Sequence, residues 1–124
     1  MTAIRTSRGR RARRDGRRSE IICALWLMAK GYRILGLRLK TPQAEIDLLV
    51  SKRDLVAVIE VKRRTSIDSA LDAVTPRQRE RLLRAARSIA ARRPDLAAAA
   101  IRLDLMALAP RRWPRHIRDA WRDA

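Results

Sequence analysis

The chain has 124 residues, enough for one domain with a modest core and too few for two independent cores. Lys and Arg number 30 against 13 Asp and Glu, which gives a formal net charge of +17. Because such an excess destabilises a compact state unless a polyanion offsets it, we expect a nucleic-acid partner, with Arg coding bias and general solvation as the alternatives.

The apolar runs and the cysteine content exclude a membrane-spanning protein and a disulfide-stabilised one. No apolar run approaches the ~18 residues that cross a membrane, so no membrane partner is expected. Cys23 is the only cysteine, which excludes a disulfide within the chain. Since thiols without a partner are usual in a reducing compartment, a cytoplasmic protein is expected.

Residues 1–18 contain eight Arg, one Asp and few apolar side chains. A segment of this composition cannot bury enough surface to offset the entropy of ordering. It is therefore predicted as a disordered basic arm that precedes a single domain over residues 19–124. Arg17 and Arg18 are candidates for contacts with phosphates, and a merely solvated tail is the alternative.

A helix is expected from Ser19, as its N-cap, to about Lys30, with Gly31 as the C-terminal stop. It is apolar on most sides, which is typical of a helix packed across a sheet. Glu20 lies in its first turn, where the helix dipole favours a carboxylate. On physics alone that explanation is preferred, and a further acidic group pointed at a functional site is the alternative. Residues 32–39 then predict a first strand.

The stretch 44–62 consists of two apolar runs rich in Val, Leu and Ile, separated by the polar turn 51–54. This pattern is typical of a β-hairpin that is largely buried on both faces. Three charges interrupt the burial: Asp47 within the first run, and Glu60 and Lys62 at the end of the second. An unpaired buried charge costs several kcal/mol or shifts its pKa, so these side chains need partners.

The length of the hairpin connection decides whether the three charges meet. Side chains alternate along a strand, so Glu60 and Lys62 share a face. A connection of even length puts Asp47 on that face and an odd one puts it on the other; we predict an even connection. Two carboxylates and an ammonium on one face would form a hard-oxygen site able to hold Mg²⁺ or Mn²⁺, with the lysine free to orient an attacking water.

Basic residues surround this proposed site in the sequence. A polar loop after the hairpin begins with Arg63 and Arg64, and a short helical stretch follows around residues 69–74. Both arginines would border the site.

An amphipathic helix is expected over residues 76–93, with Pro76 in its first turn. One stripe is apolar, while the rest carries seven Arg and one Glu, too one-sided a pattern for paired charges. Arg77, Arg81 and Arg84 are therefore candidate phosphate contacts, and a merely solvated face is the alternative.

Residues 98–108 predict a fourth strand, joined to the third through helices and so expected to run parallel to it with a right-handed crossover. The basic tail contains Trp113, His116 and Trp121. His116 has no partner at metal-binding spacing. The tryptophans are expected to anchor the tail on the core, with stacking on bases or an interaction surface for a homodimer as alternatives.

The assembled order is αβββαβ: an α/β fold with an antiparallel three-strand meander, a parallel fourth strand and flanking helices. Asp47 is followed after twelve residues by Glu60-Val61-Lys62. This resembles the PD-(D/E)xK nuclease superfamily and its restriction-endonuclease-like core. More narrowly, it resembles the YraN-like family of small bacterial proteins, related to archaeal Holliday junction resolvases. The resemblance covers residues 17–121 and rests on the segments GYRIL (31–35), EIDL (45–48), VIEVK (58–62), AVTP (73–76), RL (81–82), RLD (102–104) and HIRDAW (116–121).

The resemblance implies roles for individual residues. Glu20, Asp47 and Glu60 would bind Mg²⁺ or Mn²⁺, and Lys62 would assist the nucleophile. Glu45 would tune the site from the face of Asp47.

Three positions depart from the family pattern. Ser19 and Ala44 stand where relatives usually have Gly, and Gln78 stands where they often carry Lys and would support the site. The activity implied is metal-assisted hydrolysis of phosphodiester bonds in nucleic acid. DNA is the expected substrate, with branched or single-stranded DNA as the candidate forms. A protein of this fold that binds nucleic acid without cleaving it is the alternative.

Overall fold

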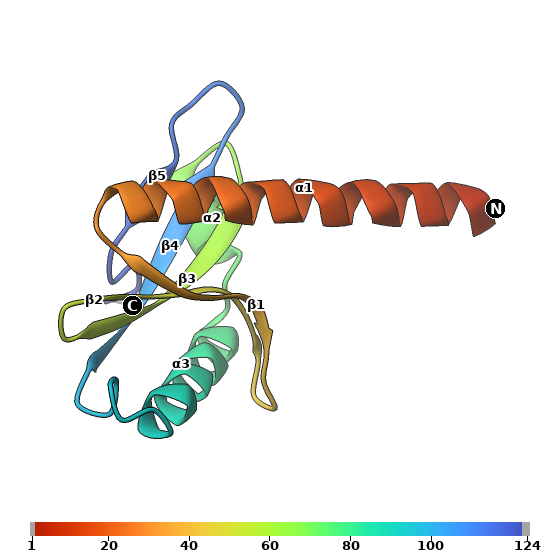
Figure 1. The fold of residues 1–124 in the computed structure, drawn as a ribbon. Coiled ribbons are helices and arrows are strands. Elements are labelled where there is room, and N and C mark those ends of the chain that lie inside the picture. Colours follow the sequence, from red (N-terminus) through yellow and green to blue (C-terminus); the bar gives the residue numbers. More distant parts are fainter. Residues whose placement is uncertain (1, 123–124) are drawn as a thin grey trace.

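The structure, a computed structural model, describes the backbone of residues 2–122 and the side chains of residues 16–122. Its elements follow one another along the chain as shown in Figure 1. They are α1 (Thr2–Ala29), β1 (Arg33–Lys40), β2 (Glu45–Lys52), β3 (Leu55–Arg63), α2 (Ile67–Asp72), α3 (Pro76–Ala91), β4 (Ala100–Leu108) and β5 (Arg115–Ile117).

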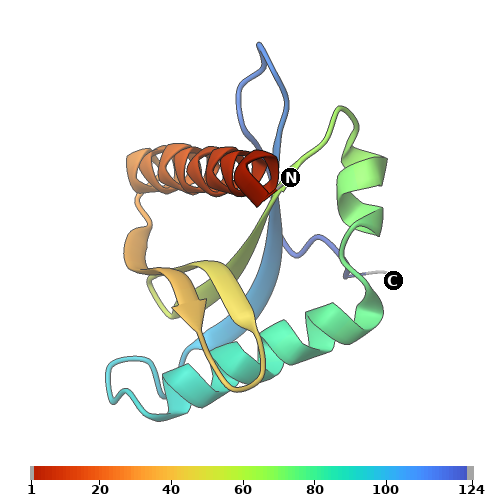
Figure 2. The same ribbon diagram turned by 90° about the vertical axis from the view of Figure 1, so that its right-hand side faces the viewer.

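The strands form a single sheet in the order β1-β2-β3-β4-β5. β3 and β4 run parallel, whereas the other neighbouring pairs are antiparallel. Figure 2 shows α1 on one side of the sheet and α3 on the other. The predicted α/β fold, with its meander and its parallel fourth strand, is confirmed. β5 was not predicted, because three residues are too few to show the alternation that identifies a strand.

Helix α1 begins at Thr2, not at Ser19 as the sequence indicated. Ser19 is buried within the helix rather than capping it. The reason is that Arg and Ala are good helix formers even where they bury little, and no proline interrupts the segment. The N-terminal part of α1 extends past the sheet (Figure 1). A separate role for residues 1–18 as a basic arm stays a prediction.

The other end of α1 is as predicted. Gly31 adopts φ 92°, the left-handed conformation that glycine takes without steric cost. Its N–H donates to Met28 O, and the N–H of Tyr32 donates to Leu27 O, each at 3.0 Å. This pair of hydrogen bonds is a Schellman motif, which satisfies the last carbonyls of the helix and turns the chain into β1.

Over residues 16–29, where its side chains are described, α1 buries only one face, whereas the sequence indicated burial on most sides. Cys23, Ala24 and Leu27 pack against the sheet. Four large apolar side chains of the helix are exposed instead: Ile21, Ile22, Leu25 and Met28. In the part of the chain that is described, no helix has both the length and the apolar character needed to cross a membrane.

Helix α3 closes the opposite face of the sheet. Its N-cap, Thr75, accepts a hydrogen bond from the N–H of Gln78, whose side chain accepts one from the N–H of Thr75 in return. This capping box fixes where the helix begins. The buried side chains of α3 pack on the strands in one cluster, which includes Leu82, Ala85, Ala86 and Ala90 with Leu49, Val56, Val58 and Leu103.

The C-terminal tail is anchored on this core. Trp121 packs in the cluster beside α2, and its Nε1 donates to Leu71 O at 3.2 Å. The predicted anchoring is therefore confirmed for Trp121. Trp113 is 77% exposed, and its ring centroid lies 5.5 Å from that of Trp26 on α1.

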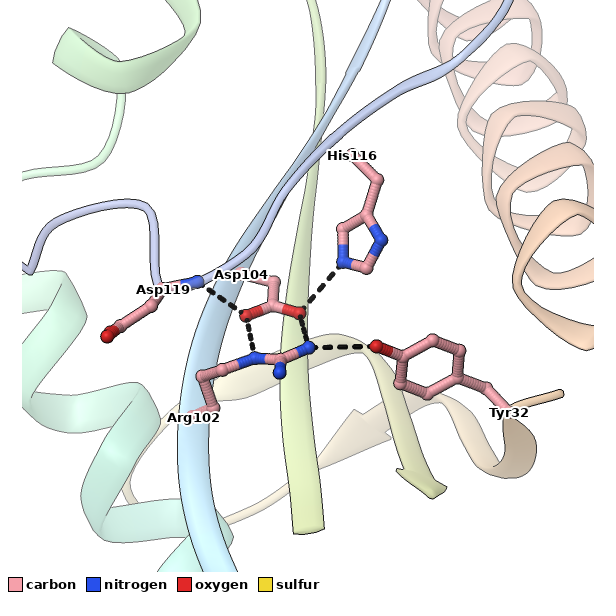
Figure 3. A network of polar contacts seen from close by, with 5 residues as sticks. All are labelled: Tyr32, Arg102, Asp104, His116 and Asp119. Atoms are coloured by element: carbon pink, nitrogen blue, oxygen red, sulfur yellow. Dashed lines mark hydrogen bonds and ion pairs between the residues drawn. The ribbon is translucent and has the colours of Figure 1, made fainter. Parts of the chain in front are cut away.

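A buried carboxylate holds β4, β5 and the tail together (Figure 3). Asp104 on β4 is 0% exposed. Its Oδ1 accepts from Arg102 Nε at 2.7 Å and from the N–H of Asp119 at 2.9 Å. Its Oδ2 accepts from Arg102 Nη2 at 2.7 Å and from His116 Nε2 at 2.8 Å. Arg102 also donates to the hydroxyl of Tyr32 at 2.9 Å, which ties the network to the end of α1.

These bonds keep Asp104 ionised. Burial alone would raise its pKa, but the hydrogen bonds from His116 and Arg102, together with that from the N–H of Asp119, hold the pKa below its ordinary value. His116 has no partner at metal-binding spacing in the sequence, and this network could not be found there because its members come from distant parts of the chain.

We predict that Asp104→Asn lowers the free energy of unfolding by about 3–5 kcal/mol, because it leaves the half-buried Arg102 guanidinium without its counter-charge. Urea denaturation measures the loss. Asp95→Asn is the matched control, since the ion pairs described for Asp95, with Arg33 and Arg93, are exposed, and it should have a much smaller effect. Equal small losses in the two variants would contradict the assignment.

Candidate active site

The hairpin of β2 and β3 has the even connection that the sequence predicted. The strands pair in register as far as Leu48↔Ile59 and are joined by a two-residue turn. Arg53 in this turn has φ 55°, as short hairpin turns require. Asp47 and Glu60 are the next residues of the two strands beyond this pair. The even connection is thereby confirmed, while a shared face for the two carboxylates stays a prediction.

Asp47 is held to β3 by a backbone hydrogen bond. The half-buried carboxylate accepts a hydrogen bond at Oδ2 from the N–H of Val61, at 2.9 Å. The charge of Asp47 also raises the pKa of Glu60, so the two carboxyls lie close to each other. The side chain of Asp47 is therefore held at the end of β3, near Glu60.

The environment of Glu60 opposes its ionisation. The residue is 7% exposed. Burial raises the pKa of Glu60 to about 8, with a further contribution from the negative charge of Asp47. Lys62 Nζ, 4.0 Å from Glu60 Oε2, acts in the opposite direction. Burial also raises the pKa of Asp47. At neutral pH the two carboxyls thus retain a proton, which a bound cation would displace.

Glu20 approaches this pair from α1. It is 8% exposed, and burial raises its pKa despite an opposing ion pair with Arg38. In that ion pair Arg38 Nε donates to Glu20 Oε2 at 2.6 Å. The charges of Asp47 and Glu45 also act on Glu20, so the acidic groups form one electrostatic cluster. The sequence indicated Glu20 only through a family resemblance, and its partner Arg38 was missed.

The carboxyl pair fits a hard divalent cation. Mg²⁺ in proteins is commonly held by one or two carboxylates together with waters and substrate phosphates, and Asp47 and Glu60 offer such oxygens side by side. Glu20 is engaged by Arg38 instead. Within the described residues, no three His, Cys, Asp or Glu side chains are gathered as a ready-made metal site. The three-carboxylate Mg²⁺ or Mn²⁺ site stays a prediction.

A pocket of about 240 Å³ opens beside Glu60. It is lined by Gln43, Ala44, Glu45, Glu60, Gln78, Arg81 and Leu82. Glu45 is exposed at its edge. The Oε1 of Gln78 accepts from the N–H of Thr75 at 2.9 Å, so its amide is held in the cap of α3 while it lines the pocket. The structure thus brings the predicted supporting residues, Glu45 and Gln78, to the site.

The predicted phosphate-binding arginines are all exposed: Arg17, Arg18, Arg63, Arg64, Arg77, Arg81 and Arg84. Four of them lie close to site residues in the chain: Arg17 and Arg18 precede Glu20 with Ser19 in between, and Arg63 and Arg64 follow Lys62 directly. Arg81 lines the pocket. Arg84 pairs with Glu80 at 2.8 Å on the exposed side of α3, so part of its charge is already offset.

The UPF0102 pattern, described as "Uncharacterised protein family UPF0102", matches residues 19–108, which include Glu20, Asp47, Glu60 and Lys62. The chain belongs to the UPF0102 family. The predicted membership of the YraN-like family is thereby confirmed.

Other UPF0102 proteins are similar over nearly the whole chain. One from Caulobacter vibrioides (strain NA1000 / CB15N) is 62% identical over 118 residues, which cover 95% of this chain and 94% of that protein. One from Caulobacter sp. (strain K31) is 60% identical over 119 residues, covering 96% and 86%. One from Paramagnetospirillum magneticum is 48% identical over 115 residues, covering 90% and 89%.

The proton on Glu60 predicts a pH dependence of stability. Folded Glu60 keeps its proton to about pH 8, whereas the unfolded chain releases it near 4.5. Between these values the folded state binds more protons, so the free energy of unfolding falls as pH rises. We expect Glu60→Gln to remove a decline of a few kcal/mol over this range, measured by denaturation at a series of pH values without divalent ions.

Glu80→Gln is the control, because Glu80 is exposed on α3 and pairs only with Arg84 among the contacts described. Its pH profile should run parallel to that of the unchanged protein. A Glu60→Gln profile that also runs parallel would show that Glu60 ionises normally.

Proposed function

We propose that this UPF0102 protein is a divalent-metal-dependent nuclease that hydrolyses phosphodiester bonds of nucleic acid, with DNA as the expected substrate. The observation that carries the proposal is the pairing of Asp47 with Glu60 at the end of the hairpin, with Lys62 on the same face. A buried carboxyl pair that retains a proton at neutral pH is costly for a structural position. Such a pair becomes favourable once a divalent cation takes the place of the proton.

Asp47 and Glu60 would hold the ion, since their oxygens are hard and adjacent. A divalent ion bound there supplies positive charge to the phosphate and to the departing oxygen. The hydrogen bond from Val61 N–H to Asp47 keeps one carboxylate aimed at the site before substrate arrives. This preorganisation lowers the cost of bringing the reacting groups together.

Lys62 is placed to orient the attacking water. Its side chain is 24% exposed, whereas that of Glu60 is 9% exposed. The ammonium therefore lies on the solvent side of the carboxyl pair, where a water can approach. From there Lys62 can donate a hydrogen bond that orients the water for in-line attack on phosphorus.

The arginines provide a path for the polyanion to this site. Arg63 and Arg64 follow Lys62 directly, and Arg81 lines the pocket beside Glu60. Their forked guanidinium groups bind phosphate oxygens without reading base sequence. A strand held by these residues would place its backbone, not its bases, at the carboxyl pair.

A protein that binds nucleic acid without cleaving it is the second candidate. One observation favours it: Glu20 already has a close cation in Arg38, at 2.6 Å, so the acidic cluster is partly neutralised without a metal. Under this alternative the carboxyl pair would be structural, and affinity would come from the arginines alone.

The two candidates differ in Lys62→Ala. If the nuclease proposal is right, Mg²⁺- or Mn²⁺-dependent cleavage of a panel of branched, flapped, single-stranded and duplex DNA falls by at least about a hundredfold, because the water loses its orienting donor. Circular dichroism should show an intact fold. Lys40→Ala is the matched control, since Lys40 is an exposed lysine at the end of β1.

Cleavage that persists in Lys62→Ala would reject the assigned role of Lys62. Absence of cleavage and of Mg²⁺ binding in the unchanged protein would favour the non-catalytic alternative.

Nucleic-acid binding has its own test in the salt dependence of affinity. Each phosphate neutralised on duplex DNA contributes about 0.9 to the slope of log K against log salt. Replacing Arg63 and Arg64 together by Gln should therefore lower the slope by about 2, measured by fluorescence anisotropy over a salt series. Arg53→Gln, in the turn at the opposite end of the hairpin, is the control. An equal loss in both variants would show that binding is not centred on the site.

A further inference from the structure

Arg38 stands in a row of charges that crosses three strands. β1 and β2 pair at Leu37↔Leu48 and at Leu39↔Ile46, so Arg38 lies opposite Asp47. Asp47 in turn lies near Glu60 on β3, whose pKa its charge raises. The order across the sheet is therefore cation, carboxylate, carboxyl. The positive charge of Arg38 lowers the pKa of Asp47, which shows that it is felt at the carboxyl pair.

Two backbone features accompany the contact between Arg38 and Glu20. A Cβ added to Gly16 on α1 would lie 2.5 Å from Nη2 of Arg38, so glycine at this position leaves the space that the guanidinium fills. Arg38 itself adopts φ 48° within β1, a conformation that costs free energy for any residue with a side chain. An unfavourable backbone conformation that is kept at a functional site points to a use for the side chain.

We propose that Arg38 is the resident cation of the acidic cluster and exchanges partners when the site is loaded. Without a divalent ion it neutralises Glu20. When a divalent ion binds, Glu20 turns to it, and Arg38 is released to bind a phosphate of the nucleic-acid strand. This inference rests on the proposed function, and it assigns Arg38 as a positioning residue for the strand.

The chemistry of the groups supports the exchange. Two positive charges of different kinds compete for the same carboxylates, and a divalent ion attracts them more strongly than a guanidinium does. Once released, the planar fork of Arg38 matches two oxygens of a phosphate. The side chain is 31% exposed, so a strand can reach it without opening the core. Metal binding and strand binding would then strengthen each other: the metal releases Arg38 for the strand, and a strand that binds Arg38 releases Glu20 for the metal.

The first test is a Mg²⁺ titration by calorimetry without nucleic acid. Arg38→Gln removes the competitor for Glu20, so the affinity for Mg²⁺ should rise by about tenfold. A merely structural role of Arg38 would instead leave the affinity unchanged or lower it. The double variant Glu20→Gln/Arg38→Gln removes both charges and should lose the gain, which also guards against instability of the single variant.

Arg33→Gln is the matched control. Arg33 lies on the same strand and pairs with Asp95 at 3.3 Å, away from the acidic cluster. It should leave the Mg²⁺ affinity unchanged.

The second test measures DNA affinity with and without Mg²⁺ in the Lys62→Ala background, where the strand is not cleaved. Mg²⁺ should strengthen DNA binding in Lys62→Ala and should do so several-fold less in Lys62→Ala/Arg38→Gln. Equal strengthening in the two, or an unchanged Mg²⁺ affinity in Arg38→Gln, would overturn the exchange and leave the nuclease proposal standing. No Mg²⁺ binding in any variant would instead reject the proposed function, and this inference with it.

Discussion

The carboxyl pair of Asp47 and Glu60 is the constraint on which the candidate site depends. A β-hairpin with a two-residue turn brings them together, and burial makes full ionisation of both unfavourable. A carboxyl group in such surroundings needs either a proton or a cation. Three nearby residues supply positive charge: Lys62 beside Glu60, Arg38 on the neighbouring strand, and Arg81 in the adjoining pocket.

Helices α1 and α3 and the C-terminal tail support the candidate site in different ways. α1 covers one face of the sheet and delivers Glu20, while α3 covers the other and contributes the pocket wall. The network around Asp104 locks the far edge of the sheet, so that β3 is held between two fixed neighbours. The carboxyl pair therefore lies on a well-supported part of the sheet. The arginines that flank it are exposed to solvent.

The local features of the fold could be predicted from the sequence, because they depend on neighbouring residues. Gly31 ends α1 and Pro76 begins α3, as their backbone preferences require. The even connection of the hairpin could also be predicted, because polar turn residues separate two apolar runs. What could not be predicted depends on distant residues: Arg38 reaches Glu20 across 18 positions, and Arg102 reaches Tyr32 across 70. The continuation of α1 to Thr2 could not be predicted from burial, because the segment is poor in apolar residues and its helix depends on intrinsic propensity.

The central claim is that Asp47 and Glu60 together bind one divalent cation. The most direct measurement is an anomalous difference map from crystals of the protein grown with Mn²⁺, an ion that prefers the same oxygen ligands as Mg²⁺. The account predicts a single strong peak between the two carboxylates, within coordination distance of both, and its absence in Asp47→Asn. Well-ordered crystals with no peak at this position, or with the peak bound only by other residues, would contradict it.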